Sequence, residues 1–307
     1  MRRAVSEFSR VRRFRQILSM SIRLIALDLD GTLLNSRGHL SDRNRQAIAA
    51  ARALSVRVAL VTGRRFRDAR PLALELGLDV PVIAHNGALT KHARTLETVA
   101  AILLPLAAAR EVVRVGRAHG ADPLVSVDPE GAGVLVYDHV SEENRPLAEY
   151  IKWARRIHGD EAEQAVVRVE SVEQYLDHAP VHISFSGTTA NTEKLVAALE
   201  REVGASVKLM TTLYPRVNFG LIDIIHPAVS KGTGLAAVAE EYGLTPEAVM
   251  AVGDNHNDVE MLRYAGTGVV MANAEPLLLG DPQFHLTAAN DEDGVALAIE
   301  RFILREG

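Results

Sequence analysis

Short apolar segments alternate with segments of helical periodicity in the first 88 residues. Residues 22–29, 56–62 and 82–85 are strand-length runs of nearly continuous apolar side chains that end in polar residues. Such runs are typical of parallel strands that are buried on both faces. Residues 42–54 and 66–76 instead place apolar side chains at helical spacing, so they are predicted to be helices.

The order strand, helix, strand, helix, strand is typical of a doubly wound α/β sheet. Ser41 is placed to cap the first helix, and Gly77 follows the second where glycine is favoured beyond a helix end. Because such crossover connections are almost always right-handed, the strands are expected to be parallel. Their carboxyl ends then meet at one edge of the sheet, where open α/β sheets bind ligands.

The pattern becomes mixed between residues 90 and 219 and returns to α/β alternation after Lys231. The predicted elements of the middle region are helices at 106–118 and 193–203, strands at 134–137 and 181–185, and a turn at 128–131. The predicted elements after it are helices at 233–242, 258–264 and 295–304 and strands at 248–252 and 268–271. We therefore predict a discontinuous, Rossmann-like parallel-sheet core at residues 21–88 and 222–307, with an inserted α+β domain at residues 89–221.

The composition is that of a soluble globular protein, with 48% of the 307 residues hydrophobic and 24% charged. This length favours two cores rather than one. The net charge of −5 provides no basic field for nucleic acid, and no apolar run is long enough to span a membrane. The absence of cysteine excludes disulfides, thiolate catalysis and cysteine-held metals, and the cytoplasm is the expected location.

The first twenty residues differ from the rest of the chain, because residues 1–20 contain six arginines and the single acid Glu7. They lack the apolar core of a secretion signal, whereas an Arg-rich, acid-poor composition leaves a transit peptide open. We favour a flexible or non-native N-terminal extension that takes no part in the function.

Asp28 and Asp30 stand at the end of the first predicted strand and are followed by Gly31. Because side chains alternate along a strand, both carboxylates are expected on one face, roughly 7 Å apart. Carboxylates this close repel each other unless a cation lies beside them, and Mg²⁺ prefers such oxygen ligands. The pair alone is weak evidence for a site, since a strand end with a solvated turn looks the same.

Two further clusters follow at Thr62-Gly63 and at Lys231. Thr62 and the N–H of Gly63 offer a small anion cradle at the end of the second strand. Lys231 opens a helix in a chain that has five lysines among 34 basic residues, which suggests that a compact ammonium is required there. Taken singly, these residues also fit a strand-to-helix turn and a solvated lysine.

Asp254, Asn257 and Asp258 form a fourth cluster, directly after the strand predicted at 248–252. An acid at a helix start is stabilised by the helix dipole and can orient a lysine or the water of a metal ion. Asn and Asp are also ordinary N-cap residues. Three polar side chains so close together nevertheless exceed what a cap requires.

The four clusters together place carboxylates, one lysine and one hydroxyl at one sheet edge, which indicates phosphate and Mg²⁺ as ligands. The sequence contains no P-loop motif and no G-x-G-x-x-G motif, so nucleotide-binding folds of those types are not indicated. With no cysteine and no serine paired to a base, an aspartate is the remaining nucleophile, and it would form an aspartyl-phosphate.

In this order the clusters resemble the four motifs of the haloacid dehalogenase superfamily. The matching residues are Asp28-x-Asp30-Gly31-Thr32, Thr62-Gly63-Arg64, Lys231 and Gly253-Asp254-x-x-Asn257-Asp258. The inserted domain resembles the large α/β cap of the Cof-type sugar-phosphatase branch. Further short segments that resemble this family lie at residues 85–88, 230–232, 270–274 and 290–295. The resemblance runs from about residue 22 to the C-terminus.

The resemblance implies a role for each residue of the motifs. Asp28 would be the nucleophile, and Asp30 the general acid and then the general base. Mg²⁺ would be held by Asp28, the backbone carbonyl of Asp30 and Asp254, with Asp258 as a further or supporting ligand. The phosphoryl oxygens would be bound by the Leu29 N–H, Thr62, the Gly63 N–H, Lys231 and Asn257.

The expected function is a Mg²⁺-dependent phosphatase of small phosphorylated metabolites, with the inserted domain as a lid that excludes water. A phosphomutase would share the catalytic residues and would differ in retaining its phosphorylated intermediate. A receiver-like switch also uses an acceptor aspartate, Mg²⁺, a threonine and a lysine, but it has no inserted domain and no partner like Asp30. A non-catalytic binding protein is disfavoured by the presence of both Asp28 and Asp30.

Overall fold

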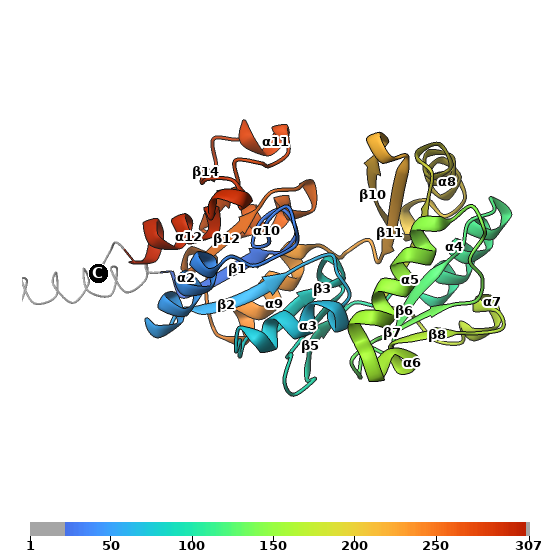
Figure 1. Cartoon of the computed structure of the whole chain (residues 1–307), viewed down its shortest axis with the longest axis horizontal. Coiled ribbons are helices and arrows are strands. Elements are labelled where there is room, and N and C mark those ends of the chain that lie inside the picture. Colours follow the sequence, from blue (N-terminus) through green and yellow to red (C-terminus); the bar gives the residue numbers. More distant parts are fainter. Residues whose placement is uncertain (1–21, 305–307) are drawn as a thin grey trace, which may run out of the picture. The chain divides into compact units, whose positions relative to one another are not determined.

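The computed structural model describes residues 22–304 and divides them into two compact units (Figure 1). The N-terminal extension predicted at residues 1–20 lies outside the described residues. Unit 1 comprises residues 22–62, 72–83 and 230–304, and unit 2 comprises residues 63–71 and 84–229. The chain therefore passes from one unit to the other several times.

A parallel sheet forms the centre of unit 1 (Figure 1). Its strands lie in the order β14-β13-β12-β1-β2-β3, and each neighbouring pair is parallel. They are β1 (Leu24–Asp28), β2 (Arg57–Val61), β3 (Val82–Ala84), β12 (Val249–Gly253), β13 (Thr267–Val270) and β14 (His285–Leu286). Leu24 of β1 pairs with Val249 on one side and with Arg57 on the other. The predicted doubly wound core is confirmed, with β1 in the middle of the sheet.

Helices pack against this sheet and complete the apolar core of unit 1. They are α2 (Asp42–Ala53), α9 (Lys231–Glu241), α10 (Val259–Tyr264), α11 (Pro276–Leu279) and α12 (Gly294–Ile299). Leu235 of α9 and Met261 of α10 are fully buried in one cluster with Leu24 and Val249. Burying a side chain of this size contributes about 1.5–3 kcal/mol, so this packing fixes the strands whose ends carry the polar clusters.

Helix α3 (Phe66–Glu75) is shared between the two units. It has Pro71 in its interior, and proline provides no N–H for the carbonyl four residues before it. The boundary between the units falls directly after this proline. The first half of α3 therefore packs with unit 2 and the second half with unit 1.

Unit 2 is built on a second sheet, in the order β10-β11-β9-β6-β7-β8. The strands are β6 (Leu124–Val127), β7 (Val134–Tyr137), β8 (Val166–Arg168), β9 (His182–Gly187), β10 (Lys208–Tyr214) and β11 (Phe219–Ile225). All neighbours are antiparallel except β7 and β8. Two short strands, β4 (Leu89–Lys91) and β5 (Thr98–Ala101), form an antiparallel hairpin that continues the first sheet beyond β3.

Helices pack on both faces of the second sheet, which confirms a mixed helix-and-sheet unit. They are α4 (Leu106–Ala118), α5 (Arg145–His158), α6 (Ala162–Ala165), α7 (Val172–Tyr175) and α8 (Thr189–Glu202). Val125 of β6 belongs to the apolar cluster of α4 and α8, whereas its neighbour Leu124 belongs to that of α5 and α6. Within residues 22–304, no helix has the length and apolar character needed to cross a membrane.

Several elements differ from the sequence predictions. The strand expected at 82–85 ends at Ala84, because His85 and Asn86 adopt positive φ angles of 51° and 57° that a strand does not accommodate. The helix expected from residue 193 begins at Thr189, after the Thr188 side chain accepts a hydrogen bond from the N–H of Asn191. Helix α5 is absent from the predicted elements.

Candidate active site

The carboxyl ends of three parallel strands bring the predicted polar clusters to one edge of unit 1. Asp28 is the last residue of β1 and pairs with Val61, the last residue of β2, so Thr62 follows at the same level. Leu27 pairs with Val252 of β12, and Asp254 follows directly after that strand. The parallel register therefore aligns these residues without any long loop.

A largely buried ionic cluster lies at this edge, and we name it the Asp28 cluster. Its members are Asp28, Lys231, Asp254 and Asp258, of which Asp254 is partly exposed. Lys231 Nζ donates hydrogen bonds to Asp28 Oδ1 and to Asp258 Oδ1, both at 2.6 Å. The three aspartates each present an oxygen within 4.8 Å of the others. Asp28, Lys231 and Asp258 are at most 4% exposed. Two buried carboxylates therefore share one buried ammonium, and the partly exposed Asp254 lies beside them.

The pKa shifts follow from this imbalance of charge. Burial raises the pKa of Asp28 well above its ordinary value, and Asp258 and Asp254 add to the rise that Lys231 opposes. Burial also raises the pKa of Asp254 to about 6 against the hydrogen bond from Thr32. Burial lowers the pKa of Lys231, but attraction to Asp258 and Asp28 outweighs it, so the net pKa is raised and the ammonium keeps its charge.

The donor set of the cluster fits a hard divalent cation. Its ligands are carboxylate oxygens, which Mg²⁺ and Ca²⁺ prefer, and its surplus negative charge is what a bound cation would balance. Both oxygens of Asp258 already accept hydrogen bonds, from Lys231 and from the N–H groups of Asp254 and Asn255. Asp28 and Asp254 therefore have more free oxygen valence for an ion than Asp258.

Close packing of two helices places Lys231 beside Asp258. Ser230 caps α9 by accepting the N–H of Thr233, which leaves Lys231 as the first helical residue. A Cβ atom on Gly232 would lie 2.8 Å from the backbone oxygen of Glu260, so glycine permits the close approach of α9 to α10. The glycine after Lys231 is therefore a packing requirement of the site.

The loop after β1 closes over Asp254. Gly31 has a φ of 86°, and a Cβ atom there would lie 2.3 Å from Asp254 Oδ2. Thr32 Oγ1 donates to Asp254 Oδ1 at 2.8 Å, and Asn273 Nδ2 donates to the Gly31 carbonyl at 2.8 Å. We predicted no role for Thr32 or Asn273 from the sequence, although both lie in segments that match the family.

The remaining predicted residues are placed as follows. Leu29 is buried directly after Asp28, and Thr62 is buried at the end of β2. Asp30 is exposed and does not belong to the group of close carboxylates, because β1 ends at Asp28 and strand alternation does not continue to Asp30. Gly63 begins the segment that packs with unit 2, and Asn257 is half-buried in the turn before α10.

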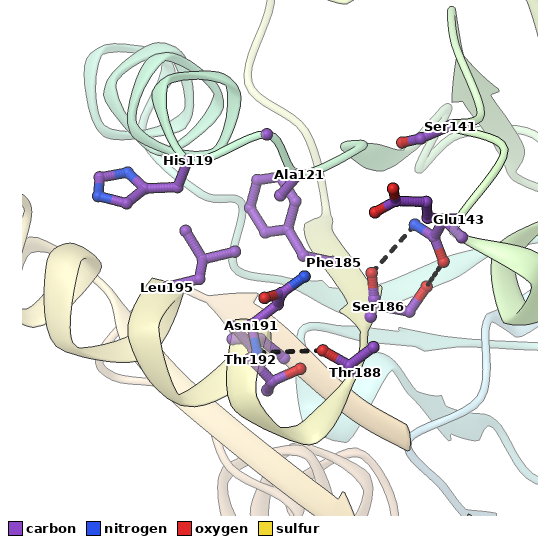
Figure 2. Close-up of a pocket in the computed structure, with 14 residues that line it drawn as sticks. His119, Ala121, Ser141, Glu143, Phe185, Ser186, Thr188, Asn191, Thr192 and Leu195 are labelled. Carbon is purple, nitrogen blue, oxygen red and sulfur yellow. Dashed lines mark hydrogen bonds between the residues drawn. The ribbon is translucent and has the colours of Figure 1, made fainter. Parts of the chain in front are cut away.

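Unit 2 contains a separate small cavity of about 120 Å³ (Figure 2). It lies at the starts of α5 and α8, whose N-cap residues Asn144 and Thr188 line it. Asn144 Nδ2 donates to the Ser186 carbonyl, and Ser186 Oγ donates to Asn144 Oδ1, as the dashed lines in Figure 2 show. None of the residues that line this cavity is one of the predicted site residues, so it is separate from the Asp28 cluster.

Comparison with known proteins gives a family match and relatives of similar length. A family model described as haloacid dehalogenase-like hydrolase matches residues 25–299. The pyridoxal phosphate phosphatase YbhA of Escherichia coli (strain K12) is 31% identical, covering 83% of this chain and 90% of that protein. The 5-amino-6-(5-phospho-D-ribitylamino)uracil phosphatase YcsE of Bacillus subtilis (strain 168) is 29% identical, covering 93% of this chain and 97% of that protein.

The fold is also similar to that of solved structures. The crystal structure of a haloacid dehalogenase-like hydrolase from Bacteroides thetaiotaomicron matches with a TM-score of 0.75 at 24% identity. The match covers 92% of this chain and 99% of that structure. The fold is therefore shared over nearly the full length of that structure.

Proposed function

The chain belongs to the haloacid dehalogenase-like hydrolase family, and we propose that it is a Mg²⁺-dependent phosphatase of small phosphorylated metabolites. The observation that carries the proposal is the buried Asp28, whose carboxylate lies 2.6 Å from the Lys231 ammonium in a cluster with surplus negative charge. A carboxylate attacks an anionic phosphate only where cations offset the repulsion between them. Lys231 supplies one such charge, and the acidic cluster accommodates a second.

In the first half-reaction, an Asp28 carboxylate oxygen attacks phosphorus and forms an aspartyl-phosphate. The bond between phosphorus and the ester oxygen breaks as the new bond forms. Asp30 acts as the general acid and gives its proton to the departing alkoxide, which leaves as an alcohol. Asp30 is an exposed residue just beyond the end of β1.

In the second half-reaction, water attacks the phosphorus of the aspartyl-phosphate. The Asp30 carboxylate takes a proton from that water, and the bond to the Asp28 oxygen breaks to release phosphate. Asp28 returns as a carboxylate and Asp30 as an acid, so the cycle closes without any further reactant.

Substrate phosphate would be held by the Leu29 N–H, Thr62, the Gly63 N–H, Lys231 and Asn257. Asp28, the Asp30 carbonyl and Asp254 would hold Mg²⁺, which supplies positive charge to the phosphoryl oxygens when it is bound. Asp258 would act through the groups that it orients, namely Lys231 and the backbone N–H groups after β12. Unit 2 would act as the cap that selects the leaving group.

Phosphate release from a panel of phosphomonoesters, with and without Mg²⁺, tests this function. The panel holds sugar phosphates, pyridoxal phosphate and 5-amino-6-(5-phospho-D-ribitylamino)uracil, because relatives are named for the latter two. We expect Mg²⁺-dependent release from at least one compound, and a phosphorylated Asp28 after rapid quenching. The same release without Mg²⁺ or without Asp28 would contradict the mechanism. Transfer to a second hydroxyl, with no free phosphate, would instead identify a phosphomutase.

A further inference from the structure

A second polar network lies in unit 2, shares no residue with the Asp28 cluster, and links four groups in sequence. The backbone N–H of Phe66 donates to His85 Nε2 at 3.2 Å. The Nδ1 atoms of His85 and His182 are 3.2 Å apart, and His182 Nε2 lies 2.8 Å from Asp223 Oδ1. Both histidines are at least nine-tenths buried. We name this path from Phe66 to Asp223 the histidine chain.

One arrangement of protons satisfies every contact in the histidine chain. The Phe66 N–H can only donate, so His85 Nε2 has no proton and the neutral His85 ring carries its proton on Nδ1. The carboxylate of Asp223 only accepts, so His182 carries its proton on Nε2. His182 Nδ1 is then the acceptor for His85 Nδ1–H. A further proton on either ring would set two donors against each other.

The surroundings keep His85 neutral. Burial holds the pKa of His85 well below its ordinary value, and His182 and Arg65 lower it further, while Asp68 opposes them. The charge of Arg65 is itself balanced by Asp68, which accepts from Arg65 Nε at 2.8 Å and from Arg65 Nη2 at 2.9 Å. Asp68 also contacts Tyr150 and His158 of α5, so these four residues form the Arg65 cluster.

His85 forms two hydrogen bonds with the loop that follows Thr62. Its backbone N–H donates to the Arg64 carbonyl at 2.9 Å, and its ring accepts the N–H of Phe66. The next residue, Asn86, lies against the same loop, because a Cβ atom on Gly63 would be 3.1 Å from Asn86 Oδ1. Contacts with His85 and Asn86 therefore hold the segment from Gly63 to Phe66 in place.

We propose that His85 and His182 are positioning residues for the phosphate-binding loop at Thr62 and Gly63. Asp223 orients the His182 ring, His182 orients the His85 ring, and His85 holds the backbone that presents the Gly63 N–H. This inference rests on the proposed function, because only that function assigns phosphate as the ligand of this loop. The chain thereby links strands β9 and β11 to a backbone group that binds substrate.

Two amide substitutions at His182 separate the positioning role from simple packing. His182→Asn retains an acceptor near the place of Nδ1 and thus keeps the partner of His85. His182→Gln retains a donor near the place of Nε2 for Asp223 but offers His85 no acceptor. Asn is one methylene smaller than Gln, so loss of packing alone would harm the Asn variant more, which is the opposite of the order expected from the positioning role.

The kinetic test measures kcat and KM with the panel compound that is hydrolysed fastest, and the inhibition constant of inorganic phosphate. His182→Gln is expected to raise KM and the phosphate constant by roughly 3- to 10-fold with kcat within about 2-fold, as expected for a lost hydrogen bond that acts on binding. His182→Asn is expected to restore most of the loss. The exposed His178, changed to Gln, serves as the control with unchanged constants.

Imidazole NMR of the free protein tests the proton arrangement independently of catalysis. We expect the Nδ1–H tautomer for His85 and the Nε2–H tautomer for His182, and the opposite tautomer in either ring would overturn the histidine chain. Equal KM values for the Gln and Asn variants of His182, in an active enzyme, would overturn the positioning role alone. A wild-type protein that hydrolyses no compound of the panel would instead contradict the proposed function.

Discussion

Two buried ionic clusters, one in each unit, differ in their balance of charge. The Arg65 cluster pairs one guanidinium with one carboxylate, and both side chains are nearly buried. Burial raises the pKa of Asp68, but the hydrogen bond from His158 and the charge of Arg65 outweigh it, so the net pKa is lowered. In the Asp28 cluster the pKa values of Asp28 and Asp254 are raised instead.

The direction of the aspartate pKa shift distinguishes an ionic cluster that stabilises the fold from one that binds a ligand. A buried charge is stable when a partner of opposite charge satisfies it, as in the Arg65 cluster. An excess of like charge in a buried site is unfavourable until a ligand supplies the missing charge. The Arg65 cluster is therefore expected to support stability, and the Asp28 cluster to support binding and catalysis.

The largest expected effect is that of Asp28→Asn on turnover. An amide oxygen does not act as the nucleophile, so phosphate release should fall by at least about 10³-fold. The melting temperature should not fall, because the substitution removes one of three neighbouring carboxylates that repel one another. Phosphate-release assays and thermal unfolding measure the two effects. Retained turnover, or a large loss of stability, would reverse the assignment of this cluster.

The second effect is the loss of stability expected for Asp68→Ala. This change leaves the Arg65 guanidinium buried without its carboxylate, which typically costs about 3–5 kcal/mol of unfolding free energy. Denaturant unfolding followed by circular dichroism measures it. The matched control is Glu149→Ala, which breaks an exposed pair with Lys152 and should leave the midpoint unchanged. Equal midpoints for the two variants would show that the Arg65 cluster does not stabilise the fold.

The third effect separates backbone strain from contact with Asp254. Gly31→Ala places a methyl group 2.3 Å from Asp254 Oδ2, so it should raise the Mg²⁺ concentration needed for half-maximal activity by roughly 10- to 100-fold. Gly38 has a similar φ of 76° but no neighbour within 4 Å of a Cβ atom, so Gly38→Ala tests the strain alone. An equal rise in the half-maximal Mg²⁺ concentration in both variants would contradict a specific effect on Asp254.

The smallest effect is the pH dependence of Mg²⁺ binding. Asp254 has a pKa of about 6 in the ion-free protein, so its carboxylate form is lost as the pH falls through that value. A protonated carboxyl is a poor ligand, and the Mg²⁺ affinity should fall by up to about tenfold per pH unit below about 6. Calorimetry between pH 5 and 8 measures this, with Asp254→Asn as the reference that lacks this group. If the Mg²⁺ affinity were unchanged down to pH 5, Asp254 would not be a Mg²⁺ ligand that is protonated in this pH range.

The core strands were predictable because each is a compact run of apolar residues, as in β1 and β12. The Asp28 cluster was predictable because parallel strands end at a common edge, which makes local motifs into neighbours. Helix α5 was missed although its apolar face buries Leu147 and Ile151, because its sequence is dense in charges and aromatic residues.

Other parts of the site depend on contacts that no local pattern encodes. His85 and His182 are far apart in sequence, and their contact arises only when β9 is placed in the second sheet. The same holds for Asn273, which reaches the Gly31 carbonyl from a different segment. Such pairings follow from tertiary structure rather than from propensity, so the sequence alone could not supply them.

The position of β1 between β2 and β12 has a consequence for synthesis on the ribosome. Leu24 can pair with Arg57 early, but Val249 is synthesised only after all of unit 2 has been made. At translation rates of about 5–20 residues per second, one edge of the apolar strand β1 waits on the order of ten to forty seconds for its neighbour. Unit 2 can complete its own sheet in that interval, whereas the nascent β1 is exposed to chaperones and to aggregation.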